Sequence, residues 1–92
     1  MIRTTEGIQL GQLVTSKAGR DKDKEYLVVK ILDESFVYLV DGNLRKLKSP
    51  KRKNIKHVQA TNIIAKELQQ KLLNGDRIDD EGIRQLIVEL MG

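Results

Sequence analysis

Residues 26–40, YLVVKILDESFVYLV, decide the fold that we predict for this chain. Two runs rich in β-branched and aromatic residues, 26–32 and 36–40, flank the polar turn Asp33-Glu34-Ser35. This is the pattern of two β-strands joined by a turn. Because apolar side chains fall on both faces of each run, we predict that both are central strands of a sheet.

Weaker strand signals lie before and after this pair. Residues 13–15 precede a polar turn at residues 18–21, and residues 57–60 are a candidate last strand. Five short strands about ten residues apart predict a small closed β-barrel. Closure would remove the exposed sheet edges that favour aggregation.

The segment that follows residue 40 predicts a tight hairpin. Asp41-Gly42-Asn43 supplies residues that tolerate positive φ, as a two-residue hairpin turn requires. Residues 44–48 then form a short basic strand, although Leu44 and Leu47 would face opposite sides of it. Ser49-Pro50 ends this strand, because proline has no N–H to donate to a neighbouring strand.

The last third of the chain changes to a helical period. Thr61 is a candidate N-cap, Glu67 and Lys71 form a favourable i,i+4 pair, and Gly75 accepts the left-handed conformation that ends a helix. The apolar side of this helix comprises Ile64, Ala65, Leu68 and Leu72.

A second helix is predicted after Asp79, which we take as its N-cap. Ile78 and Ile83 then occupy the positions of a hydrophobic staple. The apolar stripe of this helix comprises Ile83, Leu86, Ile87, Leu90 and Met91. We therefore expect a mainly β fold with C-terminal helices: a barrel over residues 1–60 and a helical extension over residues 61–92. The extension packs on or beside the barrel in one folding unit, because helices this short do not fold alone.

Composition limits the functions that the chain can have. Ninety-two residues without cysteine fit one domain and exclude disulfides and thiolate metal sites. We find no signal peptide and no apolar stretch long enough for a membrane span, so we expect a cytoplasmic protein without a membrane partner.

Residues that could perform catalysis or bind metal are sparse. His57 is the single histidine and has cations but no orienting acid beside it, which makes it a poor general base. Asp79-Asp80-Glu81 fits a helix start better than a calcium loop. Asp21 and Asp23 alternate with cations, which predicts local charge balance in a loop. We expect no enzyme activity, no cofactor and no metal.

Positive charge is concentrated in one segment, 45–56, which has seven cations in twelve residues and no acid. Residues 1–60 carry 13 Lys/Arg and 7 Asp/Glu, whereas residues 61–92 carry 4 and 6. Such asymmetry favours a polyanionic partner over a merely solvated surface. The candidate phosphate contacts in the segment are Arg45, Lys46, Lys48, Lys51, Arg52, Lys53 and Lys56.

The aromatic residues bear on the kind of nucleic acid. Tyr26, Phe36 and Tyr38 all lie in predicted strands, where a core position is the natural one. Proteins that bind single strands stack bases on exposed aromatic rings. We therefore expect structured RNA, recognised by shape and backbone, and charge alone leaves DNA as an alternative.

The region 10–60 resembles a KOW-motif domain, in particular the bacterial KOW-domain RNA-binding proteins that are similar to archaeal and eukaryotic large-subunit ribosomal proteins. The matching pieces are Gly11-Gln12-Leu13-Val14, Ser16-Lys17-Ala18-Gly19-Arg20-Asp21, Val40-Asp41-Gly42, Pro50-Lys51-Arg52-Lys53-Asn54 and Lys56-His57.

The resemblance implies an SH3-like barrel that binds RNA, with ribosomal RNA the expected target and a ribosome-associated role in translation. It adds to the candidate RNA contacts Ser16, Lys17, Arg20, Lys22, Lys24 and His57. The motif commonly has a glycine where this chain has Asp23, and aspartate tolerates the left-handed conformation better than most residues.

The resemblance does not cover the helices, which leaves a second hypothesis open. The apolar stripe of the second helix, or the barrel itself, could serve a protein-interaction adaptor. In that case we expect a protein partner or self-association through the C-terminal helices.

Overall fold

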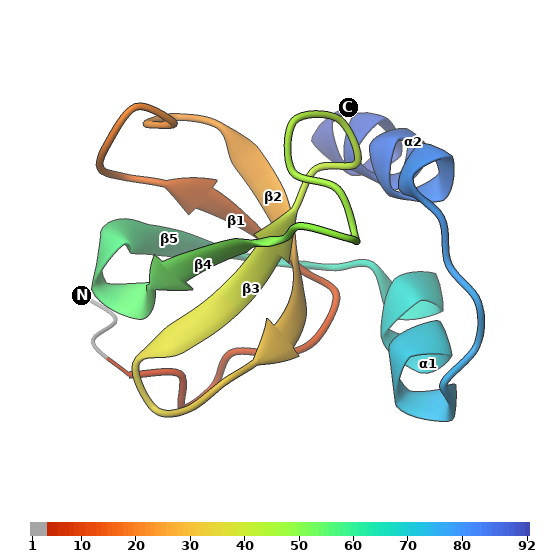
Figure 1. Cartoon of the computed structure of the whole chain (residues 1–92), viewed down its shortest axis with the longest axis horizontal. Helices are drawn as coiled ribbons and strands as arrows, with labels where there is room; N and C mark the ends of the chain where they lie inside the picture. Colours follow the sequence, from red (N-terminus) through yellow and green to blue (C-terminus); the bar gives the residue numbers. More distant parts are fainter. Residues whose placement is uncertain (1–3) are drawn as a thin grey trace.

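Five antiparallel strands form one sheet in the computed structural model, which describes residues 4–92 (Figure 1). Their order across the sheet is β4-β3-β2-β1-β5, so the two runs that decide the fold, β2 and β3, lie inside the sheet as predicted. The strands are β1 (Gln12–Ser16), β2 (Glu25–Ile31), β3 (Phe36–Val40), β4 (Lys51–Asn54) and β5 (Val58–Ile64).

The sheet curls around a first hydrophobic core on its inner face (Figure 1). Irregular pairing between Val28 and Lys30 in β2 and between Gln12 and Val14 in β1 interrupts the regular register, and such bulges increase the bend of a sheet. The 3-10 turn η1 (Ile55–His57) joins β4 directly to β5. The first core comprises Ile8, Val14, Tyr26, Val28, Val37, Leu39, Ile55 and Val58.

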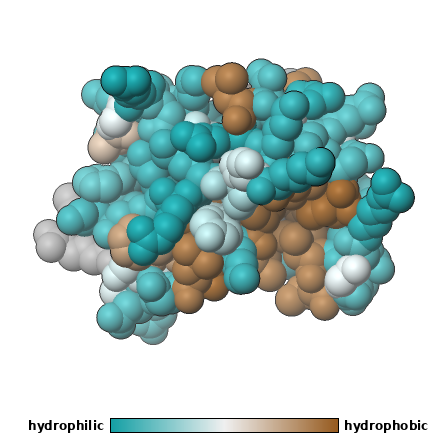
Figure 2. Space-filling model, viewed as in Figure 1, coloured by the Kyte–Doolittle hydropathy of each residue, from teal (hydrophilic) through white to brown (hydrophobic). Residues whose placement is uncertain are grey.

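A second hydrophobic core lies on the outer face of the same sheet, where two helices cover it (Figure 1). The helices are α1 (Lys66–Asn74) and α2 (Asp80–Met91). Figure 2 shows hydrophobic residues gathered between the sheet and these helices. Burial on both faces explains why β2 and β3 contain consecutive apolar residues, such as residues 26–28 and 39–40, instead of a strict alternation. The buried members of the second core are Leu13, Leu27, Val40, Ala65, Leu68 and Ile83.

The apolar stripe of α2 is used within the chain. Ile83 is buried, and Leu86, Ile87 and Leu90 pack against the second core, whereas Met91 is exposed. The helices therefore dock on the sheet, and the strand region extends past residue 60 to Ile64 before α1 begins.

Two of the three helix-end predictions are confirmed, and so is the predicted i,i+4 pair. Gly75 ends α1 with a left-handed φ of 72°, Asp79 is the N-cap of α2 and accepts a 2.7 Å bond from the Gly82 N–H, and Glu67 pairs with Lys71 at 3.4 Å. The N-cap prediction for Thr61 is wrong. Thr61 lies in β5, where its hydroxyl donates to the Leu13 carbonyl at 2.8 Å, and this contact with a distant strand outweighs the local capping preference.

The predicted hairpin and basic strand over residues 41–48 are also wrong. Residues 41–50 form one long loop, and Pro50 precedes β4 instead of ending a strand. The Asp41 carboxylate accepts bonds from the Asn43 and Arg45 N–H groups, both at 2.9 Å, and bends the backbone away from β3. The chain consequently resumes pairing with β3 only at residue 51.

The last strand starts one residue later than predicted and is longer. His57 belongs to η1, and β5 runs over Val58–Ile64. Within residues 4–92, neither helix has the length and hydrophobicity needed to cross a membrane.

Candidate nucleic-acid interface

The loop between β1 and β2 is closed by backbone bonds at its base. The Ser16 N–H donates to the Lys24 carbonyl at 2.9 Å, and the Asp23 N–H donates to the Ser16 carbonyl at 2.8 Å. Asp23 has a φ of 72° and is the only non-glycine residue of 4–92 with positive φ. Asp23 therefore adopts the left-handed conformation that aspartate tolerates better than most residues.

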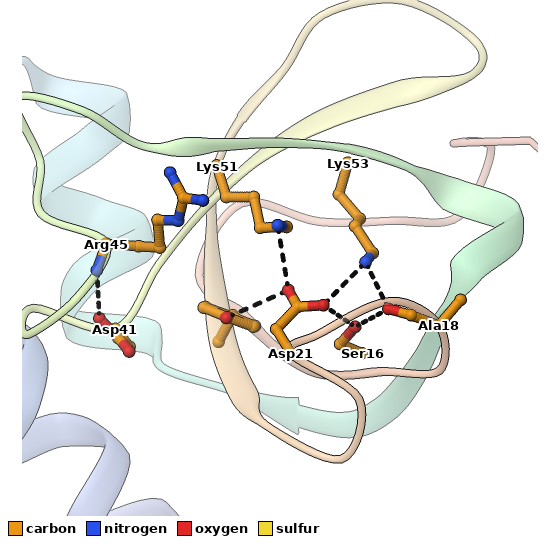
Figure 3. Close-up of polar contacts among 8 residues, drawn as sticks. Ser16, Ala18, Asp21, Asp41, Arg45, Lys51 and Lys53 are labelled. Atoms are coloured by element: carbon orange, nitrogen blue, oxygen red, sulfur yellow. Dashed lines mark hydrogen bonds and ion pairs between the residues drawn. The ribbon is translucent and has the colours of Figure 1, made fainter.

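A buried carboxylate, Asp21, ties this loop to β4 (Figure 3). Its Oδ1 accepts bonds from the Ser16 hydroxyl at 2.9 Å and from the Lys53 ammonium at 3.1 Å. Its Oδ2 accepts a 3.2 Å bond from the Tyr26 hydroxyl and lies 3.4 Å from Lys51 Nζ. Each carboxylate oxygen thus lies near two donor groups, which come from β1, β2 and β4.

The charges around Asp21 fix its ionisation state. Burial by itself would raise the pKa of Asp21, but hydrogen bonds from Lys53 and Ser16 and the positive charges of Lys53 and Lys51 outweigh burial. Together they hold the pKa well below the ordinary value of 3.8. The carboxylate therefore stays charged at neutral pH and balances Lys53, which is only 8% exposed.

Tyr26 gives a direct test of this network. Burial and the nearby Asp21 carboxylate raise the pKa of Tyr26 to about 12. Because the folded state favours the neutral phenol, this contribution to stability is complete below about pH 10 and is lost as the pH rises towards about 12. In a Tyr38→Phe variant Tyr26 is the sole tyrosine, and we expect its tyrosinate absorbance to rise with a midpoint near 12 while circular dichroism still reports a folded chain.

The urea-unfolded Tyr38→Phe chain provides the control, since its phenol is expected to titrate near the ordinary pKa of 10.0. A folded protein whose phenol also titrates near that value would contradict the Asp21–Tyr26 contact.

A concave, positively charged surface opens beside Asp21. This cationic hollow has a volume of about 400 Å³ and is formed by the β1–β2 loop, the 41–50 loop and β4. Asp21 is the one acid among its lining residues. The lining residues are Gly19, Arg20, Asp21, Lys24, Tyr26, Leu44, Arg45, Lys51 and Lys53.

Helix α2 holds the 41–50 loop in place. Gly42 has a φ of 77° and packs so closely against α2 that an added Cβ would lie 2.3 Å from the Asp80 carbonyl oxygen. The Arg84 guanidinium donates to the Gly42 carbonyl, and the Asp80 carboxylate accepts a 2.8 Å bond from the Leu47 N–H. The helix therefore determines where the loop places Arg45 at the hollow (Figure 3).

The structure brings most of the predicted contact residues to one end of the sheet. Lys17, Arg20, Lys22 and Lys24 are exposed on the β1–β2 loop. The Lys17 N–H donates to the His57 carbonyl at 2.7 Å, which brings exposed Lys56 and His57 of η1 beside that loop. Arg45 and Lys51 are half-buried at the cationic hollow.

The other predicted contact residues are exposed outside the lining of the hollow, packed on another side chain, or buried. Lys46 and Lys48 flank Leu47, which packs into the second core beside α2. The Arg52 guanidinium lies 3.6 Å from the centre of the Phe36 ring, on the opposite face of β4 from its neighbours Lys51 and Lys53. Ser16 and Lys53 are buried and bind Asp21, so both have structural contacts rather than exposed positions.

The structural role of Asp21 was not identified from the sequence. Its position between Arg20 and Lys22 predicted local charge balance, yet it pairs with lysines 30 and 32 positions further along the chain. The cations that neighbour Asp21 in the sequence already offer a local charge balance. Its distant lysine partners can be identified only when β4 is placed beside the loop.

No protein-family model matches this chain, and the comparison with curated proteins finds no match.

Proposed function

We propose that this protein is a non-catalytic RNA-binding protein that contacts structured RNA through the end of the sheet where the β1–β2 loop, η1 and the cationic hollow meet. The observation that carries the proposal is a concave group of cations whose only acidic lining residue, Asp21, is already saturated. Within residues 4–92, Arg20, Lys24 and Arg45 form no salt bridge with an acid. Their charge is free to neutralise phosphates.

We further propose that the sheet is a closed SH3-like barrel of the KOW type. The strand order β4-β3-β2-β1-β5 and the single turn η1 between the two outer strands support closure. The left-handed Asp23 in the first loop supports the KOW resemblance, since the motif has a glycine there. On that resemblance we propose ribosomal RNA as the target and the cytoplasm as the location.

The proposed contacts are the exposed or half-buried cations of this end, together with exposed His57. Since such contacts act mainly through charge, they supply affinity with little sequence discrimination, and the affinity falls steeply with salt. The adaptor alternative gains little from α2, because Ile83 is buried and Leu86, Ile87 and Leu90 pack against the second core, which leaves Met91 as the exposed member of the stripe. The proposed contact residues are Lys17, Arg20, Lys22, Lys24, Arg45, Lys51, Lys56 and His57.

A salt titration with matched variants tests the proposal. Filter binding to structured ribosomal RNA between about 50 and 200 mM salt gives the slope of log affinity against log salt. Replacing Arg20 and Lys22 with glutamine removes two exposed cations, and we expect the slope to become shallower by about 1.5. The control is Lys66→Gln with Arg77→Gln, which removes the same charge from exposed positions on and after α1 and should leave the slope nearly unchanged.

Equal slopes for the two double variants would show that binding depends on net charge alone and would remove the β1–β2 loop from the interface. Failure of the wild-type protein to bind structured RNA across this salt range would refute the proposed function itself.

A further inference from the structure

The cationic hollow carries more positive charge than the protein itself neutralises. Arg20, Lys24 and Arg45 line it without any salt bridge in the described part of the chain. Asp21 cannot compensate them, because its two oxygens already accept from Ser16, Tyr26 and Lys53 and face Lys51. Uncompensated cations in a concave site concentrate the electrostatic field and attract an anion.

The size of the hollow indicates what kind of anion it can take. A volume of about 400 Å³ lies in the range of pockets that hold small organic molecules, roughly 300–1,000 Å³, and leaves room beyond a phosphate group. The hollow also has an apolar wall, since Leu44 lines it while being 70% exposed. A lining that combines several cations with an exposed apolar side chain fits a phosphate attached to a nucleoside.

We propose that the cationic hollow binds one nucleotide, with the phosphate between Arg45, Lys51 and the loop cations and the nucleoside against Leu44. This inference rests on the proposed function, because the nucleotide would be a unit of the bound RNA that enters the hollow. A guanidinium can form two parallel hydrogen bonds to phosphate oxygens. We therefore expect Arg45 to contribute most to the orientation of the phosphate.

The hollow is shaped before any ligand arrives. Asp21 fixes Lys53 and Lys51 on one wall, and α2 fixes the 41–50 loop through Gly42 and Leu47 on the other. The backbone of both walls and the two lysines bound to Asp21 are therefore fixed before binding, and such preorganisation favours affinity for a small ligand.

The test is an NMR titration of the full chain with three probes: AMP, inorganic phosphate and adenosine. We expect AMP to produce saturable shifts in the amides that line the hollow, phosphate to produce weaker shifts at the same amides, and adenosine to produce none at equal concentration. Arg45→Gln should weaken AMP binding about tenfold. The Arg45 side chain makes no hydrogen bond or salt bridge within residues 4–92, so this variant keeps the fold, which circular dichroism verifies. Arg77→Gln, which removes an exposed arginine outside the hollow, should bind AMP like the wild type.

Three results separate this inference from the proposed function. Shifts that do not saturate, or an Arg45→Gln variant that binds AMP as the wild type does, overturn the nucleotide site even if structured RNA still binds with a steep salt slope. Saturable AMP binding together with RNA binding that Arg45→Gln weakens supports both. Saturable AMP binding by a protein that fails to bind RNA supports the site as one for free nucleotides and refutes the proposed function.

Discussion

Replacing Gly42 with alanine is expected to lower the free energy of unfolding by about 3 kcal/mol, the sum of two physical costs. The first is the left-handed φ of 77°, which disfavours any residue with a Cβ. The second is steric, because the new methyl group would meet the Asp80 carbonyl oxygen at 2.3 Å and the Arg84 backbone nitrogen at 3.0 Å. Urea denaturation followed by circular dichroism measures the loss.

The substitution Gly75→Ala measures the backbone cost without the steric cost. Gly75 has nearly the same φ, 72°, but an added Cβ there would have no neighbour within 4 Å. We expect it to cost only about 1 kcal/mol, the backbone part alone. Gly11→Ala, with a φ of 80° and a closest contact of 2.8 Å to the Ala65 carbonyl oxygen, should fall between them. Equal losses at Gly42 and Gly75 would mean that α2 does not pack against the 41–50 loop as described.

Replacing Asp21 with asparagine is expected to destabilise the chain by about 3 kcal/mol, because it leaves the Lys53 charge buried without a partner. The Asp21 and Lys53 side chains are only 9% and 10% exposed, so water cannot replace the lost carboxylate. Thermal unfolding should show a fall in Tm of roughly 15 °C. Lys51→Met, which removes the more exposed partner, should cost no more than about 1 kcal/mol.

A double-mutant cycle identifies the cause of that loss. In Asp21→Asn combined with Lys53→Met, both buried charges are gone. The Ala18 carbonyl loses its bond from Lys53 but keeps a donor, because the Ser16 hydroxyl donates to it at 3.1 Å. We expect the double variant to be more stable than the sum of the single changes predicts, by at least about 1 kcal/mol. Additive losses would show that the two side chains are not coupled, and would place the effect of Asp21 elsewhere.

The sequence predicted the features that depend on neighbouring residues. Strands over 26–40 follow from β-branched and aromatic composition, and the helix ends at Gly75 and Asp79 follow from capping chemistry within a few residues. The left-handed tendency of Asp23 is likewise a property of one residue and its loop. In each case the physical cause lies within one turn or one strand.

Features that depend on distant partners were missed or wrong. The 41–50 loop has the residues of a hairpin, but the Asp80 and Arg84 contacts that hold it come from a helix more than thirty residues away. The seven cations of residues 45–56 read as one basic patch, yet Lys53 is buried, Arg52 packs on Phe36 and Lys46 and Lys48 lie beside α2. The charge of a side chain can be read from sequence, but the direction in which it points depends on the sheet.

The attachment of the 41–50 loop to α2 has a consequence for the order in which the protein matures. During synthesis all five strands leave the ribosome before α2 does, since α2 follows them in the chain. Until then α1 is the only helix available to cover the outer face of the sheet, and the contacts from Asp80 and Arg84 that hold the loop carrying Arg45 are missing. The nascent sheet can therefore acquire its inner core first, whereas the complete set of cations is assembled only after the final helix has docked.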